Sequence, residues 1–174
     1  FDLIREYIDF MKKTVPVDLT GMKIVIDCAE GASYKTSVET LRELGAELVA
    51  IHTNPDGTNI NSNCGSTHME ELQARVVYEK AAVGLAFDGD ADRCLAVDEN
   101  GELVDGDKLI AICSKAYKEQ GRLKNNSAVV TVMTNIGFSQ FAKENDINII
   151  TANVGDRYVL EKMLEGGYNI GGEQ

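Results

Sequence analysis

The chain has 174 residues, of which 44% are hydrophobic, and its 28 acidic and 17 basic residues give a formal net charge of −11 at pH 7. This hydrophobic content supports a packed core and argues against disorder. The acidic balance argues against nucleic acid as a partner, because nucleic-acid phosphates require clustered Lys and Arg. No apolar stretch approaches the roughly 20 residues that span a bilayer, so no membrane partner is expected.

Helix and strand patterns alternate through the first half of the chain. In order, the expected elements are a helix over 1–14 ended by Pro16, a strand over 23–28, a helix over 37–44, a strand over 47–51, a polar loop over 53–66, a helix ending near Lys80, a strand over 83–87, and a hairpin of 94–97 with 102–104. Such β-α-β alternation favours a largely parallel sheet covered by helices.

A break falls at Asp105-Gly106-Asp107, which we interpret as a turn and a helix N-cap. The expected elements after it are a helix over 108–120, a strand over 128–132, a helix over 137–144, a strand over 147–151 and a helix over 158–164. We therefore predict an α/β fold with a mixed, largely parallel sheet flanked by helices. Residues 1–105 form one complete unit and residues 106–174 part of a second, similar unit, whose open sheet edge could pair with a neighbour in a homo-oligomer.

Both ends of the chain suggest an internal piece of a longer protein. Phe1 enters directly into an amphipathic pattern, and Gln174 follows a loop-like Gly171-Gly172-Glu173 with nothing to close it.

The most informative segment is Phe87-Asp88-Gly89-Asp90-Ala91-Asp92-Arg93. In an extended segment alternate residues point the same way, so the three aspartates can aim their carboxylates at one point. Three close negative charges favour a hard divalent cation, and Mg²⁺ with three protein carboxylates keeps positions open for water or phosphate. Arg93 stands beside the cation, where it can bind phosphate through two parallel hydrogen bonds.

Two other interpretations of this loop compete. The spacing resembles a calcium-binding EF-hand with Glu99 at position 12, but Arg93 stands where that loop needs glycine, and the flanks read as strands. Alternatively, the segment is a solvated acidic turn without an ion, whose crowded carboxyls would titrate together with at least one raised pKa.

Two further segments could contact a ligand. Val154-Gly155-Asp156-Arg157-Tyr158 follows a strand and opens a helix, where Asp156 is expected to cap the helix, and where a phosphate or a sugar hydroxyl could bind. The terminal Gly171-Gly172-Glu173-Gln174 presents one carboxylate after two glycines that allow close backbone approach.

The remaining thiols and imidazoles suggest no site. We expect buried free thiols of a reducing, cytoplasmic protein at the four widely spaced cysteines, Cys28, Cys64, Cys94 and Cys113. His68 is expected to be structural, and His52 stands at a strand end with no recognisable constellation around it.

These motifs identify the chain as similar to the α-D-phosphohexomutase family over essentially all its residues. The metal loop of that family reads D-G-D-[GA]-D-R, which Asp88–Arg93 matches. Residues 59–61 with 64–68, and residues 154–159, are similar to segments typical of the family's glucosamine branch. Gly172-Glu173 resembles the beginning of its sugar-recognition loop, G-E-x-S-G.

The resemblance implies a four-domain enzyme of which this chain is the second domain and part of the third. In the family, a phosphoserine on the first domain donates its phosphoryl group to glucosamine 6-phosphate. A bisphosphate forms and reorients, and the 6-phosphoryl returns to the serine. Mannose and glucose phosphates are the substrates of the alternative branches.

The resemblance also implies roles for individual residues. Mg²⁺ would be held by Asp88, Asp90 and Asp92, and Arg93 would contact the phosphoryl group. Gly155, Asp156, Arg157 and Glu173 would face the phosphorylated amino sugar. The phosphoserine loop and the phosphate-binding fourth domain lie outside the chain, so we expect no turnover from this piece alone.

Overall fold

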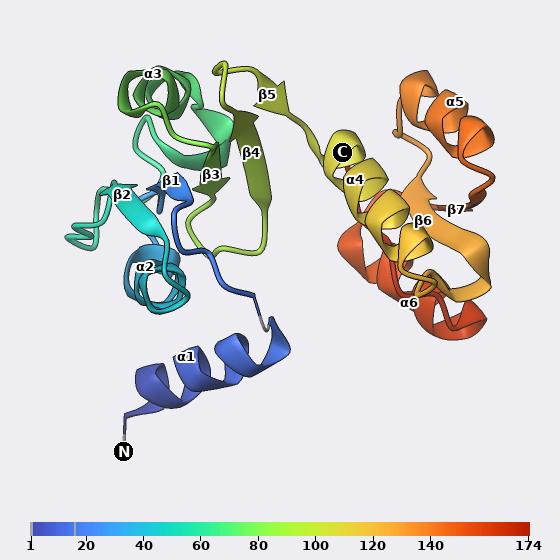
Figure 1. Cartoon of the computed structure of the whole chain (residues 1–174), viewed down its shortest axis with the longest axis horizontal. Coiled ribbons are helices and arrows are strands. Elements are labelled where there is room, and N and C mark those ends of the chain that lie inside the picture. Colours follow the sequence, from blue (N-terminus) through green and yellow to red (C-terminus); the bar gives the residue numbers. More distant parts are fainter. Residues whose placement is uncertain (1, 16) are drawn as a thin grey trace. The chain divides into compact units, whose positions relative to one another are not determined.

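The computed structural model describes residues 2–15 and 17–174, and the chain divides into two compact units, Phe1–Val104 and Asp105–Gln174 (Figure 1). Each unit is built from strands covered by helices. The predicted helix stop at Pro16 lies outside the described residues.

The first unit holds a five-stranded mixed sheet in the order β2-β1-β3-β4-β5. β2, β1 and β3 run parallel, while β4 and β5 are added antiparallel as a hairpin. Its elements are α1 (Leu3–Thr14), β1 (Lys23–Asp27), α2 (Ser33–Glu43), β2 (Glu47–Ile51), the short 3₁₀ helix η1 (Gly65–Thr67), α3 (Glu70–Glu79), β3 (Val83–Phe87), β4 (Cys94–Asp98) and β5 (Leu103–Val104). The predicted mixed, largely parallel sheet is confirmed.

Strand alternation divides the core of this unit between two faces. Val25 of β1 and Ala86 of β3 face α3, where they pack with buried Leu72 and Val76. Ile26 of β1 packs on the other side with residues of α2. Figure 1 shows α2 and α3 on opposite sides of the sheet. The carboxyl ends of β1, β2 and β3 therefore meet at one edge, where the following loops converge.

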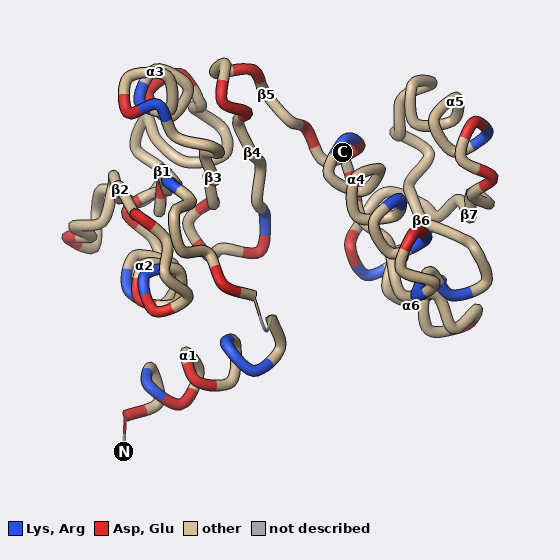
Figure 2. Tube along the Cα trace, viewed as in Figure 1, with Lys and Arg blue, Asp and Glu red and all other residues tan. Residues whose placement is uncertain are grey.

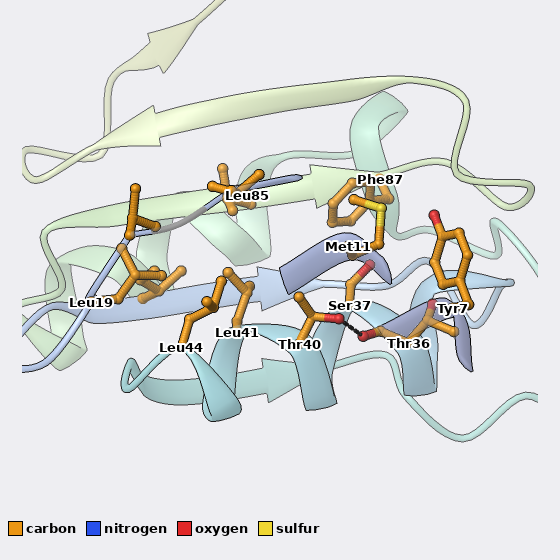
Figure 3. Close-up of a pocket in the computed structure, with 13 residues that line it drawn as sticks. Tyr7, Met11, Leu19, Thr36, Ser37, Thr40, Leu41, Leu44, Leu85 and Phe87 are labelled. Atoms are coloured by element: carbon orange, nitrogen blue, oxygen red, sulfur yellow. Dashed lines mark hydrogen bonds between the residues drawn. The ribbon is translucent and has the colours of Figure 1, made fainter. Parts of the chain in front are cut away.

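α1 packs against α2 and leaves an apolar groove of about 390 Å³ beside the α2 face of the sheet. Figure 3 shows Tyr7 and Met11 of α1 beside this groove, with Leu41 of α2 and Leu85 and Phe87 of β3. The helix is only partly covered, since Ile8 is its one buried residue among those described.

The second unit has a two-stranded parallel sheet with helices on both faces. Its elements are α4 (Gly106–Glu119), the 3₁₀ helix η2 (Lys124–Asn126), β6 (Ser127–Thr131), α5 (Ile136–Glu144), β7 (Asn148–Ala152) and α6 (Asp156–Gly166). Ile110 of α4 and Phe138 of α5 pack on one face, and Val159 of α6 packs on the other. The final segment returns beside β6 through a parallel bridge between Val129 and Gly171.

Figure 2 shows acidic residues spread over both units with basic residues among them. Cys28 and Cys64 are buried as expected, but Cys94 and Cys113 are exposed, which corrects the prediction of four buried thiols. Cys94 opens β4 beside an exposed loop, and Cys113 lies on the outer surface of α4, so neither takes part in the core. Within the described residues, no helix combines the length and apolarity that a membrane crossing requires.

Candidate metal centre

The acidic loop, Asp88–Arg93, connects β3 to β4 at the edge where the parallel strands end. Asp88 is 2% exposed, whereas Asp90 and Asp92 face solvent. The structure brings the three side chains together, with one carboxylate oxygen of each within 4.8 Å of the others. Ala91 adopts a left-handed conformation with φ of 62°, which curls the loop so that alternate carboxylates converge.

Arg93 forms ion pairs with Asp88 and Asp92 of this loop. Its backbone N–H donates to Asp88 Oδ1 over 3.0 Å, and its Nε donates to Asp88 Oδ2 over 2.8 Å. Its Nη2 also lies 2.7 Å from Asp88 Oδ2. The guanidinium is thus fixed at the inner end of the loop, although its side chain is 69% exposed.

The electrostatics of the loop follow from this pairing. Burial raises the pKa of the Asp88 carboxyl, but the backbone hydrogen bond and the positive charge of Arg93 outweigh it and leave that pKa below its ordinary value. Burial and the charges of Asp88 and Asp90 raise the pKa of Asp92. Arg93 therefore pairs closely with Asp88 and more distantly with Asp92, whose Oδ1 lies 3.5 Å from its Nε. One arginine faces three carboxylates, so net negative charge remains in the loop. An all-oxygen donor set of this kind fits a hard cation such as Mg²⁺ or Ca²⁺.

The structure contradicts the EF-hand interpretation of this loop. The loop joins two antiparallel strands in which Phe87 pairs with Cys94. An EF-hand loop is instead flanked by two helices.

A neighbouring loop holds the acidic loop at very short range. The Ala32 N–H donates to the Gly89 carbonyl over 2.8 Å. A Cβ atom added at Gly31 would lie 2.2 Å from the same carbonyl oxygen, so only glycine fits there. On the other side, a Cβ at Gly89 would lie 2.6 Å from the Ile60 side chain. The loops after β1 and β2 thus fix the backbone from which the carboxylates project.

In the second unit the structure brings together Gly155 and Glu173. The Gly155 N–H donates to Glu173 Oε1 over 2.7 Å, and the Glu173 residue is half-buried. Gly155 has a φ of +126°, a conformation that favours glycine. The two predicted ligand segments therefore meet at the end of the second sheet.

Asp156 and Arg157 do not join them in that contact. Asp156 was expected to cap α6, but the N-cap is Gly155, and no side chain caps the helix. Gly155 is the N-cap because its positive φ lies outside the helical region, and the helix therefore begins with Asp156. The Asp156 carboxylate accepts from the Arg157 N–H over 2.7 Å, and Arg157 Nε donates to Glu161 over 2.9 Å along the exposed helix surface.

The structure also shows polar residues that the sequence analysis missed. Asp105 does cap α4 as predicted, accepting from the Lys108 N–H over 2.9 Å. The next acid, Asp107, is 2% exposed and accepts from the Asn135 N–H over 2.8 Å, so it ties the loop after β6 to the start of α4. A second missed group surrounds His52, at the ends of β1 and β2. The one sequence signal for this group was an acidic residue, Asp27, at the end of an apolar strand.

The chain is similar to known proteins along nearly all of its length. Residues 5–101 match the model of phosphoglucomutase/phosphomannomutase alpha/beta/alpha domain II, and residues 105–174 match that of domain III. The chain is 63% identical over 172 residues to the phosphoglucosamine mutase of Clostridium novyi (strain NT), and 56% identical over 171 residues to that of Clostridium beijerinckii. Each alignment covers 98% of this chain, which spans only 38% of the length of either relative.

Solved structures agree on the fold. A phosphoglucomutase/phosphomannomutase family protein from Burkholderia thailandensis matches 99% of this chain and 38% of its own, with a TM-score of 0.85 at 24% sequence identity. An N-acetylglucosamine-phosphate mutase of the α-D-phosphohexomutase superfamily, in its apo form, matches 98% of this chain and 40% of its own, with a TM-score of 0.68 at 18% identity.

Proposed function

The chain belongs to the phosphoglucomutase/phosphomannomutase family, and on that premise we propose that it is the metal-binding and part of the sugar-binding portion of a phosphoglucosamine mutase. The complete enzyme would interconvert glucosamine 6-phosphate and glucosamine 1-phosphate. The phosphoserine and the remaining domains would come from parts of the enzyme outside these 174 residues. Alone, the chain would give no turnover.

The observation that carries the proposal is the convergence of three carboxylates beside an arginine at the carboxyl edge of a parallel sheet. Enzymes of this family generally use a metal ion. Asp88, Asp90 and Asp92 would hold Mg²⁺, because their oxygens are the ligands this ion prefers and their number leaves coordination positions for phosphate oxygens. When bound, the ion supplies positive charge that offsets the charge on a transferring phosphoryl group.

Arg93 would bind the phosphoryl group. Its guanidinium is held at the loop by Asp88, yet most of its side chain is exposed, so it can reach a ligand from there. An arginine presents two parallel N–H donors to a phosphate, which fixes the orientation as well as the charge. Metal loop and arginine together would position the phosphoryl group between the serine and the sugar hydroxyl, and positioning of this kind supplies much of the rate.

The second unit would contribute recognition of the sugar. Glu173 is held by the Gly155 N–H, and its remaining lone pairs can accept from sugar hydroxyl or amino groups. Asp156 and Arg157 lie at the exposed start of α6, where the helix dipole favours an anionic group. Gly155, Asp156, Arg157 and Glu173 are therefore proposed as the substrate-facing set.

An exchange of segments tests the proposal. The matching 172 residues of the Clostridium novyi phosphoglucosamine mutase are replaced by this chain, to which they are 63% identical. We expect mutase activity within about tenfold of the parent enzyme, since the acidic loop and Arg93 supply the same charges. Glucosamine 6-phosphate, glucose 6-phosphate and mannose 6-phosphate are compared as substrates, and the amino sugar should be preferred.

The control is the same exchange with a segment from a phosphomannomutase, which shows whether the inserted piece influences sugar preference. A chimera that folds but has no activity would contradict the proposal. So would a chimera whose substrate preference moves toward mannose 6-phosphate or glucose 6-phosphate. Measurable glucosamine 1-phosphate formation by the isolated chain would contradict its predicted dependence on the other domains.

A further inference from the structure

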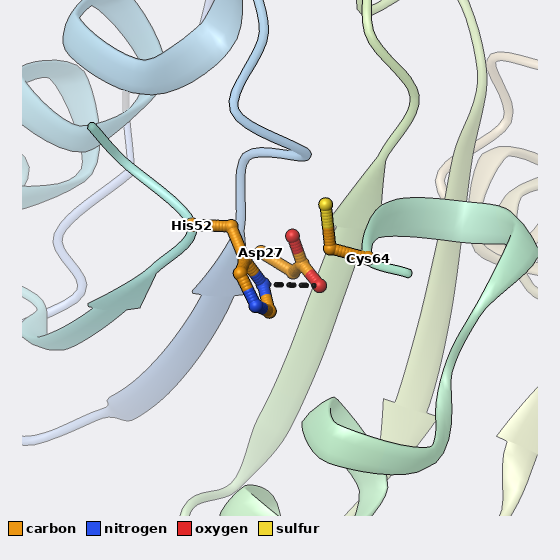
Figure 4. Close-up of side chains that lie close together, drawn as sticks. All are labelled: Asp27, His52 and Cys64. Atoms are coloured by element: carbon orange, nitrogen blue, oxygen red, sulfur yellow. Dashed lines mark ion pairs between the residues drawn. The ribbon is translucent and has the colours of Figure 1, made fainter. Parts of the chain in front are cut away.

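A second group of potential ligands lies at the ends of β1 and β2, apart from the acidic loop. Asp27 ends β1, His52 follows β2, and Cys64 precedes η1. One carboxylate oxygen, one imidazole nitrogen and the thiol sulfur lie within 4.8 Å of one another. Figure 4 shows the three side chains close together, with Asp27 between His52 and Cys64, each from a separate segment of the chain.

The imidazole of His52 is held in the orientation that a metal ligand needs. Its Nε2 lies 3.3 Å from the Glu71 carboxylate, so Nε2 can carry the proton and Nδ1 the lone pair. Metal-bound histidines usually donate their second ring N–H to a carboxylate in this way. The Nδ1 atom is buried and makes no hydrogen bond, although it lies only 3.0 Å from Asp27 Oδ2.

That short approach is informative because it is not aligned as a hydrogen bond. With Nε2 protonated, two electron-rich atoms face each other, and a cation between them removes the repulsion. Nitrogen and oxygen ligands about 2.0–2.1 Å from one metal ion lie about 3.0–3.4 Å apart, which is close to the observed separation. His52 also has a φ of 52°, an uncommon conformation that places its ring over the end of β1.

The other two ligands are equally prepared. Asp27 is fully buried, and its two carboxylate oxygens accept from the Ala29 N–H over 2.8 Å and from the Gly65 N–H over 2.9 Å. Such bonds orient a ligating carboxylate and leave it lone pairs to share. Cys64 is 1% exposed, and burial together with the charges of Asp27 and nearby glutamates raises the pKa of its thiol to about 11. The free thiol therefore keeps its proton, which it would release on binding a metal ion.

We infer that Asp27 Oδ2, His52 Nδ1 and Cys64 Sγ form a second cation site, selective for a borderline transition metal such as Zn²⁺. A thiolate and an imidazole select zinc over magnesium, which prefers oxygen alone. Glu71 acts outside the coordination sphere by orienting His52. The expectation that His52 has no constellation around it was wrong, because its partners stand 25 and 12 residues away in the chain.

The position of the site gives it a structural consequence. Gly65 follows Cys64 directly, and a Cβ atom there would lie 2.5 Å from the carbonyl oxygen of Phe87, the residue before the acidic loop. The Asn61 N–H in the same loop donates to the Ala29 carbonyl over 2.9 Å. A metal ion at Cys64 would fasten this loop to β1 and so support the acidic loop from beneath. The inference does not depend on which reaction the acidic loop serves.

The test uses the whole chain with Cys94 and Cys113 replaced by serine, which leaves Cys64 and the buried Cys28 as its thiols. Zn²⁺ and Co²⁺ are titrated by calorimetry and absorption spectroscopy, with Mg²⁺ in excess to occupy the acidic loop. We expect one tight Zn²⁺ site, and a thiolate-to-metal charge-transfer band when Co²⁺ binds. Cys64→Ser should abolish the band and weaken Zn²⁺ binding by about 100-fold or more.

Glu71→Gln provides a second, milder variant, because it alters only the outer partner of His52. It should weaken Zn²⁺ binding by about 10–100-fold. Its control is the neighbouring Glu70→Gln, which should have no effect. The inference would be overturned if the Zn²⁺ affinity were unchanged in both Cys64→Ser and Glu71→Gln while each variant had the melting temperature of the parent. So would the absence of a thiolate band with Co²⁺ in the parent.

Discussion

Two clusters of potential metal ligands lie at the same edge of the first sheet, and they differ in their ligand atoms, their spacing along the chain and their burial. The acidic loop offers oxygen alone, from three aspartates within five consecutive residues, two of them exposed. The cluster of Asp27, His52 and Cys64 offers oxygen, nitrogen and sulfur from three distant segments, two of them fully or almost fully buried.

The two clusters compensate their negative charge in different ways. In the acidic loop, Arg93 pairs with Asp88 and Asp92, and solvent screens the exposed carboxylates of Asp90 and Asp92, so the loop can exist without an ion and bind one reversibly. At Asp27 the compensation comes from backbone N–H groups, because no arginine or lysine ion pair reaches it in the described part of the chain. The first arrangement suits a dissociable catalytic ion and the second a retained structural one.

The largest effect on turnover should come from Asp90→Asn in the acidic loop. Asp90 is exposed, so its loss should not unfold the chain, but it removes one oxygen ligand and one charge. In the chimeric enzyme we expect turnover to fall by about 10²–10³-fold, with the Mg²⁺ concentration needed for half-maximal rate raised. Steady-state assays over a range of Mg²⁺ concentrations measure both. Unchanged Mg²⁺ dependence would remove Asp90 from the metal site.

Asp27→Asn should have the largest effect on stability. An asparagine presents one oxygen and one NH₂ group, so one of the two backbone donors at this buried site would face another donor. We expect the free energy of unfolding to fall by about 2–4 kcal/mol. Urea unfolding followed by circular dichroism measures it. Asp18→Asn is the control, since Asp18 is exposed and accepts from the exposed Thr20, and a similar loss in both variants would contradict the role assigned to burial.

Gly31→Ala should disturb the backbone that supports the acidic loop without changing any of its carboxylates. The added methyl group would lie 2.2 Å from the Gly89 carbonyl oxygen, so one loop must move. We expect a loss of about 1–3 kcal/mol in the free energy of unfolding together with weaker Mg²⁺ binding.

Gly21→Ala is the matched control for that variant. Gly21 has a φ of +83° and open space around it, so alanine there costs about 1 kcal/mol of backbone strain without touching the acidic loop. Equal Mg²⁺ affinities in the two variants would show that the contact between Gly31 and Gly89 does not shape the metal loop.

The two clusters also mark how far the sequence alone can be interpreted. Strands at Glu47–Ile51 and Val83–Phe87 were predicted residue for residue, because short apolar runs between polar loops define both ends. Two helix starts were predicted too late: α2 begins at Ser33, not at residue 37, and α6 at Asp156, not at residue 158. The first turn of each helix carries small or polar residues, so the apolar periodicity begins only after the helix has begun.

The same limit applies to the sites. The convergence of Asp88, Asp90 and Asp92 follows from local spacing, which a sequence displays directly. The contact of Gly155 with Glu173 and the gathering of three segments around His52 depend on which strand ends become neighbours. Strand order is a property of the sheet as a whole, and residues from different loops meet only once it is set.

A third group of charges, on the surface between α1 and α2, gives the smallest expected effect and calibrates the other two. Glu43 accepts hydrogen bonds from Arg5 and Lys12, which lower the pKa of its carboxyl to about 2. Because the folded pKa lies below the ordinary value of 4.5, the stabilisation is present above about pH 4.5 and is lost as the pH falls toward 2. Solvent screens this exposed pair, so Glu43→Gln should lower the melting midpoint at pH 7 by no more than about 2 °C.

The difference between parent and Glu43→Gln should shrink through that pH window and also in high salt, whereas Glu39→Gln, on the same helix, should show neither dependence. Thermal melts at a series of pH values measure both. A Glu43→Gln effect as large as that of Asp27→Asn would mean that exposed charge pairs stabilise this fold as strongly as buried ones. The distinction between the acidic loop and the buried cluster would then lose its physical basis, because that distinction rests on solvent screening one set of charges and not the other.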